Sequence, residues 1–247
     1  MKKIFGWICF PFFILAFGFV LLSNHVLQVV FFRLGGQKGH EKAIDVLQFC
    51  LLGTLLTVFS RISVIGKVPK FPKDQPMIIV SNHQSMFDIA IIGWVFRRHH
   101  PRFISKDSLA KGIPAVSYNL RHGGSVAINR KDRKSAMKAI ADFGAYLENM
   151  GRACCIFAEG TRSRDGKVLP FKLGGMSQLL KTCPSAVIIP VAVDNSWKFS
   201  RYGHLPVPVG THLKLNILEV IDQEGKDVRQ IVEEAERKVR VCLNQQT

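Results

Sequence analysis

The stretch Met77–Asp88, with the sequence MIIVSNHQSMFD, decides the fold of this chain. Its first part, Met77–Ser81, is short, uncharged and rich in Ile and Val, as is typical of a strand that is buried on both faces. A polar turn follows, and Ser85 can cap a helix predicted over Met86–Phe96. A buried strand followed by a helix is the unit from which α/β domains are built.

The same alternation of strand and helix continues to the C-terminus. Further strands are predicted at Arg102–Ser105, Ser125–Asn129, Ala153–Ala158, Ala186–Val193 and His212–Val220. Further helices are predicted at Lys134–Asn149, at Gly175–Thr182 and after Asp227, which can cap a last amphipathic helix. The pattern predicts an α/β fold with a largely parallel or mixed sheet flanked by helices, and we assign residues 67–247 to this domain.

The first 66 residues differ in composition and predict a two-helix membrane anchor. Ile4–Leu22 has no charged residue and as a helix would be about 28 Å long, close to the thickness of the hydrocarbon core. A second apolar stretch, Ala43–Ile65, follows the basic, glycine-rich linker 33–42. If the first helix crossed the bilayer, this linker and the Lys2-Lys3 start would lie on opposite sides, which the positive-inside rule disfavours. We therefore favour two helices that enter one leaflet, with a spanning helix or a cleaved signal peptide as alternatives.

The net charge of +16 predicts an anionic partner. Residues 1–66 contain six basic and two acidic residues, so most of the excess lies in residues 67–247. Composition does not choose among nucleic acid, an anionic membrane and a phosphorylated substrate, or a surface that only aids solubility. The six cysteines show no C-x-x-C pair or zinc-site spacing, which indicates reduced side chains and no metal site.

His83 and Asp88, which follow the first buried strand, are candidates for a catalytic pair. His83 in the turn and Asp88 in the first helical turn can meet, and the carboxylate would then hold the imidazole in one tautomer. Such a pair can act as a general base without a nucleophilic side chain. The alternative is structural: Ser85-x-x-Asp88 also fits a capping box, with His83 as a turn residue.

Several charged residues follow other predicted strands. Glu159, Gly160 and Arg162 come directly after one strand, where a glycine turn exposes backbone amides and arginine is a forked donor for phosphate. Cations in comparable positions are Lys106, Arg130 and Lys172. If the strands are parallel, these residues converge on one edge of the sheet, where α/β folds bind ligands. A charged surface loop is the alternative for each of them taken singly.

These residues resemble the motifs of the glycerolipid acyltransferase family, in particular the bacterial 1-acylglycerol-3-phosphate acyltransferases. The first motif, N-H-x-S-x-x-D, is matched by residues 82–88, and the second resembles Gly124–Arg130, with Asn129 where aspartate is common. The third, F-P-E-G-T-R-S, is similar to Phe157–Ser163 with Ala158 in place of proline, and an apolar V-I-P-V strand resembles residues 188–191. The resemblance covers Asn82–Val191 in the order that the family has.

The resemblance implies a reaction. His83, oriented by Asp88, would deprotonate the sn-2 hydroxyl of lysophosphatidic acid, which attacks an acyl thioester and yields phosphatidic acid. Substrate would be bound by the remaining motif residues and nearby cations, namely Lys106, Arg130, Glu159, Gly160, Thr161, Arg162 and Lys172. Acyl-CoA or acyl carrier protein would be the co-substrate, with no cofactor and no metal. The alternatives are glycerol 3-phosphate or another lysolipid as acceptor, and a non-catalytic lipid-binding protein.

Two N-terminal helices in one leaflet would keep both basic ends on the cytoplasmic side, so we expect attachment through these helices to the cytoplasmic face of the inner membrane. The aromatic and basic stretch Trp197–Tyr202 suits a membrane interface as well as a connecting loop. A nucleic-acid partner is not expected, because the cations stand at strand ends beside His83 and Glu159, not interleaved with aromatics on one face.

Overall fold

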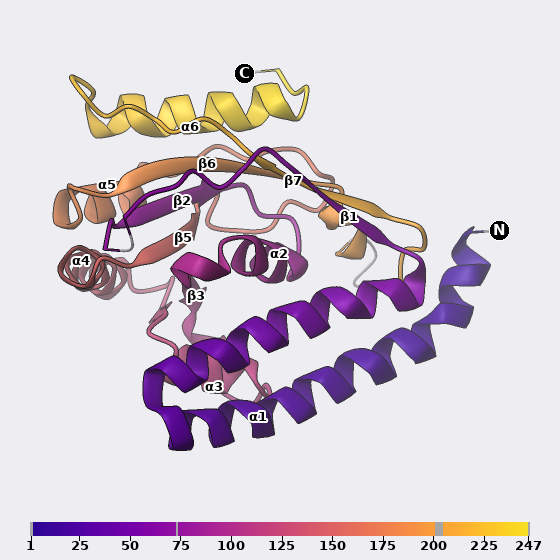
Figure 1. Ribbon diagram of the computed structural model, residues 1–247. Helices are drawn as coiled ribbons and strands as arrows, with labels where there is room; N and C mark the ends of the chain where they lie inside the picture. Colours follow the sequence, from indigo (N-terminus) through magenta and orange to yellow (C-terminus); the bar gives the residue numbers. More distant parts are fainter. Residues whose placement is uncertain (1, 73, 201–204, 247) are drawn as a thin grey trace.

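The computed structural model describes residues 2–72, 74–200 and 205–246, and its centre is a seven-stranded sheet (Figure 1). The strands lie in the order β1-β7-β6-β2-β5-β3-β4. Their bounds are β1 Arg61–Ile65, β2 Met77–Ser81, β3 Arg102–Lys106, β4 Val126–Ile128, β5 Ala153–Phe157, β6 Val187–Asp194 and β7 His212–Ile217. Six of the seven were predicted within a few residues, and β1 was not.

The sheet is mixed. Strands β2, β3, β4, β5 and β6 are parallel to their neighbours in this group, whereas β7 is antiparallel to β6 and β1 is parallel to β7. The C-terminal ends of the five parallel strands therefore share one edge. The predicted α/β class, with a mixed sheet flanked by helices, is confirmed.

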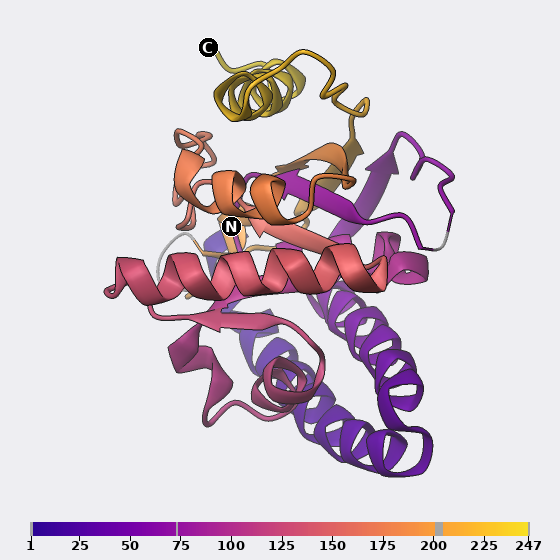
Figure 2. The same cartoon turned by 90° about the vertical axis from the view of Figure 1, so that its left-hand side faces the viewer.

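Two hydrophobic cores cover the two faces of the sheet, and β2 contributes to both. Met77 and Ile79 belong to the core under α2 (Phe87–Val95). Ile78 and Val80 belong to the core under α4 (Arg133–Met150), α5 (Leu173–Thr182) and α6 (Val228–Cys242). Successive side chains of a strand point to opposite faces, which is why this strand is apolar without interruption. Figure 2, turned by 90°, shows α6 on one side of the sheet and the long helical hairpin of α1 (Lys2–Gly53) on the other.

The other helices are α3 Val116–His122, α4 Arg133–Met150, α5 Leu173–Thr182 and α6 Val228–Cys242. As predicted, Asp227 caps α6, where it forms a capping box with Gln230. Helix α3 was not predicted. Of the stretch Trp197–Tyr202, residues 197–199 belong to the 3-10 helix η4 (Ser196–Phe199), and Arg201 and Tyr202 lie outside the described residues.

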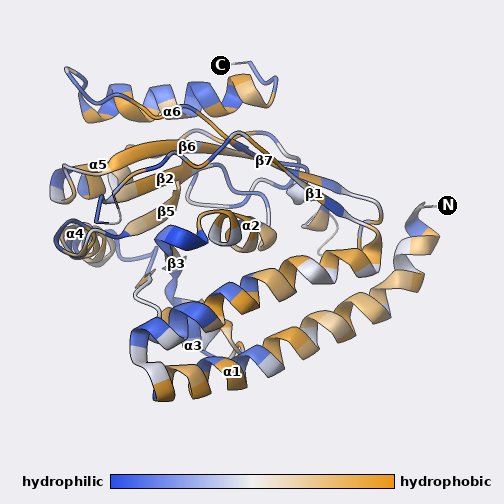
Figure 3. Cartoon of the chain, in the orientation of Figure 1, coloured by the Kyte–Doolittle hydropathy of each residue, from blue (hydrophilic) through white to orange (hydrophobic). Residues whose placement is uncertain are grey.

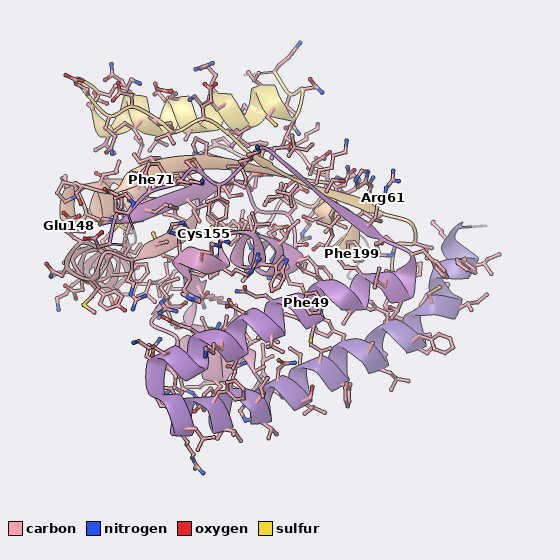
Figure 4. The ribbon with its side chains drawn as sticks, in the orientation of Figure 1. Phe49, Arg61, Phe71, Glu148, Cys155 and Phe199 are labelled. Atoms are coloured by element: carbon pink, nitrogen blue, oxygen red, sulfur yellow. The ribbon has the colours of Figure 1, made fainter. Side chains whose placement is uncertain are left out.

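The N-terminal segment forms a helical hairpin. Helix α1 (Lys2–Gly53) folds back on itself at Gly36, whose φ of 56° and ψ of −142° are accessible to glycine but strained for other residues. The second arm packs against α2, and the ring of Phe49 (labelled in Figure 4) lies 5.1 Å from that of Trp94.

The second apolar stretch is not helical to Ile65 as expected. The helix ends at Gly53, the 3-10 helix η1 (Thr54–Val58) follows, and Arg61–Ile65 pairs with β7 as strand β1. The sheet therefore begins before residue 66, where the anchor segment was predicted to end. The physical reason is that Ile62, Val64 and Ile65 are β-branched and favour a strand. Strand β7, which is distant in the sequence, provides the partner with which β1 pairs at the edge of the sheet.

The outer face of α1 is apolar and exposed (Figure 3). An exposed stripe at helical spacing consists of Ile8, Phe12, Leu15, Phe19, Leu22, Val26 and Val30. By length and composition, α1 with η1 is the one helix among the described residues that could cross a membrane.

Candidate functional site

The candidate site lies at the shared C-terminal edge of the parallel strands. Ser81 of β2 is paired with Phe157 of β5 on one side and with Val191 of β6 on the other, so the loops after these strands emerge side by side. Asn82 fixes the first loop: its Nδ2 donates to the carbonyl of Val193 at 2.9 Å, and its Oδ1 accepts from the N–H of Val193 at 2.8 Å.

His83 and Asp88 form a buried pair. The distance between His83 Nδ1 and Asp88 Oδ2 is 2.8 Å, and Asp88 is fully buried. The N–H groups of Gln84 and Ser85 also donate to Oδ2, at 2.5 and 2.8 Å. A carboxylate can only accept, so Nδ1 carries the imidazole proton and Nε2 presents a lone pair.

The capping box that was the alternative interpretation forms only in part, because Met86 is the N-cap residue of α2 and no side chain caps it. The side chain of Asp88 accepts from the N–H of Ser85, and Ser85 Oγ accepts from the N–H of Phe87 at 3.1 Å. The carboxylate of Asp88 thus binds the backbone of the turn before α2 and, through His83 Nδ1, holds the imidazole in one tautomer.

The imidazole ring is held on its face and at its outer nitrogen. The ring stacks on Phe157, with centroids 3.9 Å apart and an interplanar angle of 14°. Arg162 Nε donates to His83 Nε2 at 3.3 Å, and the N–H of Ser163 donates to the carbonyl of His83 at 2.8 Å. Nε2 therefore faces the loop that carries the arginine.

Three cations gather around Gly160. Arg130 donates to the carbonyl of Gly160 at 2.7 Å, and a Cβ at Gly160 would lie 3.1 Å from Lys172 Nζ. Burial, followed by the nearby charge of Arg162, lowers the pKa of Arg130. Cations held this close together favour an anion such as phosphate between them.

Two predicted residues are less closely connected to this group. Lys106 ends β3 at the same edge and Thr161 follows Gly160, and both are exposed. Within the described part of the chain, neither side chain forms a hydrogen bond or ion pair with His83 or Arg162.

Glu159 is buried beneath the site. It is 1% exposed, and neither carboxylate oxygen has a hydrogen-bond partner of ordinary geometry among the described residues. Burial raises the pKa of Glu159 to about 8, against the opposing effect of the backbone N–H groups of His83 and Leu169 and of the charge of Arg240. A carboxyl group in this state can accept or donate a hydrogen bond near neutral pH.

A cavity of about 310 Å³ lies between α1, α2, α3 and β3. Most of its lining is apolar, with Phe17, Leu51, Met86, Ala90 and Ile113 as examples. Arg162 also lines it, so the cavity reaches the His83 site. The ion pair of Glu41 and Arg102, with an N–O distance of 2.7 Å, forms part of the wall.

Sequence reasoning missed Ser196 and the role of the Phe157 ring. Ser196 lies in η4, 108 residues after Asp88, and its Oγ donates to Asp88 Oδ1 at 2.5 Å. No local pattern marks such a distant partner. The signal for Phe157 was its place at the end of a buried strand beside Glu159, but its stacking on His83 depends on the register of β2 and β5.

The chain is similar to known acyltransferases. The family model described as Acyltransferase matches residues 61–194, more than half of the chain. The 1-acyl-sn-glycerol-3-phosphate acyltransferase of Borreliella burgdorferi is 30% identical over 193 residues, which are 76% of this chain and 74% of that protein. Human 1-acyl-sn-glycerol-3-phosphate acyltransferase beta is 30% identical over 172 residues.

A solved structure has the same fold throughout. The crystal structure of the 1-acyl-sn-glycerophosphate (LPA) acyltransferase PlsC from Thermotoga maritima matches with a TM-score of 0.77 and 27% identity over 100% of both chains. Other relatives are longer: the matched region spans 39% of the Chlamydomonas reinhardtii 1-acyl-sn-glycerol-3-phosphate acyltransferase and 60% of the human protein. The family match, the bacterial relative and the shared fold show that this chain belongs to the acyltransferase family.

Proposed function

We propose that the protein transfers an acyl group from a thioester to the free sn-2 hydroxyl of 1-acylglycerol 3-phosphate, forming phosphatidic acid. The observation that carries the proposal is the buried His83–Asp88 pair, whose Nε2 accepts from Arg162 and faces the cations at Gly160. The relatives named 1-acyl-sn-glycerol-3-phosphate acyltransferase support this acceptor.

His83 acts as the general base. Its Nε2 takes the proton of the acceptor hydroxyl while the hydroxyl oxygen attacks the thioester carbonyl carbon. Asp88 stabilises the imidazolium that forms. When the tetrahedral intermediate collapses, the carbon–sulfur bond breaks and the thiolate takes the proton back from His83. The step balances without a covalent acyl-enzyme.

The cations bind the acceptor phosphate. Arg162 and Lys172 flank the Gly160 turn together with Arg130, and Lys106 and Thr161 lie exposed at the same edge. Because Arg162 Nε occupies His83 Nε2 in the free protein, a bound phosphate must draw the guanidinium away before the base can work. Phosphate binding and activation of His83 are thereby coupled. Glu159 and the Gly160 backbone position the glycerol.

The apolar cavity receives an acyl chain. It lies between α1 and α2 and reaches Arg162, so a chain inside it would place its carboxyl end near His83. Acyl-CoA and acyl carrier protein are the two donor classes that we propose.

The α1 hairpin anchors the protein in one leaflet, on the cytoplasmic face of the membrane. The inner face of the first arm packs on the domain, with the rings of Phe13 and Phe17 at 6.3 and 6.4 Å from that of Phe87. Phe13 and Phe17 lie in the apolar stretch that would have to cross the bilayer, and because they pack on Phe87 of the domain, lipid cannot surround this arm as it would a spanning helix. The six free cysteines and the basic hairpin tip support the cytoplasmic side.

The direct test is an acyl-transfer assay with the purified full chain. 1-Acylglycerol 3-phosphate and glycerol 3-phosphate are offered separately, each with acyl-CoA and with acyl carrier protein. Phosphatidic acid formed from the first acceptor supports the proposal. Exclusive acylation of glycerol 3-phosphate would overturn the acceptor, and no transfer by folded protein with either donor would overturn the enzymatic role.

A further inference from the structure

The loop 158–172, which contains Glu159, Arg162 and Lys172, is held by the C-terminal segment of the chain. Gln245, which follows α6, makes two hydrogen bonds to the middle of the loop: Oε1 accepts from the N–H of Val168 at 2.8 Å, and Nε2 donates to the carbonyl of Gly166 at 2.9 Å. The same amide therefore satisfies one donor and one acceptor of the loop backbone.

A second contact holds the end of the loop. Glu236 of α6 accepts a hydrogen bond from the N–H of Phe171 through Oε2 at 2.8 Å. Its other oxygen accepts from Arg240 Nε at 2.8 Å, which fixes the carboxylate on the helix surface. Phe171 directly precedes Lys172, whose own N–H donates to the carbonyl of Ala158 at 2.8 Å, so the two bonds together hold the end of the loop.

Apolar packing ties the same two segments together. Val168 and Phe171 are buried in the core that contains Ile231, Val232 and Val239 of α6. The far side of the loop is held by the catalytic turn, where the N–H of Ser163 donates to the carbonyl of His83. The loop thus lies between the turn that carries the base and the C-terminal segment.

We infer that Gln245 and Glu236 are positioning residues for the acceptor phosphate site, and that the C-terminal segment is part of the machinery that binds the acceptor. The inference rests on the proposed function. Neither residue contacts the reacting atoms; each acts through the backbone that presents Arg162 and Lys172. Cations held in place before binding lose less conformational entropy when the phosphate arrives, so loosening the loop weakens acceptor binding.

The first test is Gln245→Ala in the full chain, with steady-state kinetics for both substrates. We expect the KM for 1-acylglycerol 3-phosphate to rise about three- to tenfold, the range for one or two lost hydrogen bonds, while kcat and the KM for acyl-CoA stay at wild-type values. The matched control is Gln246→Ala, because Gln246 is the exposed neighbour and lacks these bonds. A fall in kcat with an unchanged acceptor KM, or the same change in both variants, would overturn the inference.

The second test is Glu236→Ala, with the exposed Glu233→Ala on the same helix as its control. Glu236→Ala should again raise the acceptor KM, and Glu236→Gln should restore most of the affinity because an amide oxygen can accept the Phe171 bond. Thermal unfolding of each variant confirms that the assay temperature lies below its transition. If the wild-type protein acylates the acceptor and the variants have the same kinetics, only this inference is overturned. If the folded wild-type protein is inactive, the proposed function is overturned.

Discussion

At the scale of single residues, His83 is restrained from three directions. Asp88 holds Nδ1, Phe157 stacks against the ring face, and Arg162 lies at Nε2. A base needs a fixed tautomer and an accessible lone pair, and the first two contacts supply the tautomer and the orientation. The third is a cation that a phosphate can withdraw. The chemistry of the site therefore depends on few atoms.

His83→Ala should reduce acyl transfer by at least about 10²–10⁴-fold, because the substitution removes the proposed general base. The rate is measured with saturating 1-acylglycerol 3-phosphate and acyl-CoA, and thermal unfolding checks that the variant is folded. His99→Ala in η2 (Arg97–His99) is the control for loss of an imidazole elsewhere. Turnover close to wild type by folded His83→Ala protein would rule out His83 as the base.

Glu159 predicts a dependence of stability on pH. Burial raises its pKa from 4.5 to about 8, so between these values the folded chain retains a proton that the unfolded chain has lost. The free energy of unfolding should therefore fall as pH rises from 4.5 to 8, by up to about 1.4 kcal/mol per pH unit, and level off above that range. Glu159→Gln should remove this slope, whereas exposed Glu233→Gln should not. Denaturant unfolding in detergent at pH 5, 6, 7 and 8 measures the free energy of unfolding. If this free energy changes with pH equally in wild type and Glu159→Gln, the prediction is wrong.

At the scale of elements, α1 has two different faces. Its buried side chains, such as Cys9 and Phe13, belong to the same core as Phe87 of α2, while its outer stripe is exposed. Phe19 is 72% exposed and Leu15 is 70% exposed, although each is large and apolar. A contiguous exposed apolar stripe on one helix face indicates contact with lipid.

Replacing Leu15, Phe19 and Leu22 together by Glu should release the protein from vesicles of neutral lipid, where no electrostatic attraction adds to the apolar anchor. Each large apolar side chain contributes roughly 1.5–3 kcal/mol when it leaves water. Together the three therefore raise the partitioning of the protein from water into the membrane more than about a thousandfold. Flotation with lipid vesicles measures the bound fraction. The control is Met150→Glu with Val241→Glu, two exposed apolar residues outside α1. If the triple variant floats with the vesicles as wild type does, α1 is not the anchor.

At the scale of the whole molecule, the net charge of +16 adds an electrostatic contribution to the apolar anchor. A basic residue near an anionic bilayer contributes about 1 kcal/mol, and this attraction is screened by salt. On anionic vesicles, raising NaCl from about 0.1 M to about 1 M should weaken binding of the wild type in part and abolish binding of the Leu15, Phe19 and Leu22 variant. On neutral vesicles, wild-type binding should not change with salt. Complete loss of wild-type binding in high salt would contradict an apolar anchor.

Most elements were predicted correctly because the features that specify them, such as apolar period and capping residues, lie within the element itself. Strand β2 is apolar on both faces, α6 has a cap and one apolar stripe, and the His83–Asp88 pair depends on a turn of six residues. Strand β1 was missed because an edge strand with an exposed outer face needs a partner from residues 212–217 to be recognised. The convergence of Arg130 with Gly160 was predicted from parallel strands, and the order of those strands could be seen only in three dimensions.

The amino-acid sequence by itself determined the α/β class, the positions of the buried strands and the placing of histidine, aspartate and cations at strand ends, because these depend on side-chain period and on neighbours in the chain. Only the tertiary structure decided that Ser196 supports Asp88, that the ring of Phe157 stacks on His83 and that Gln245 holds the loop of Arg162. These contacts join residues 74 or more positions apart, and their formation depends on strand order and register, which are set by the packing of the whole domain.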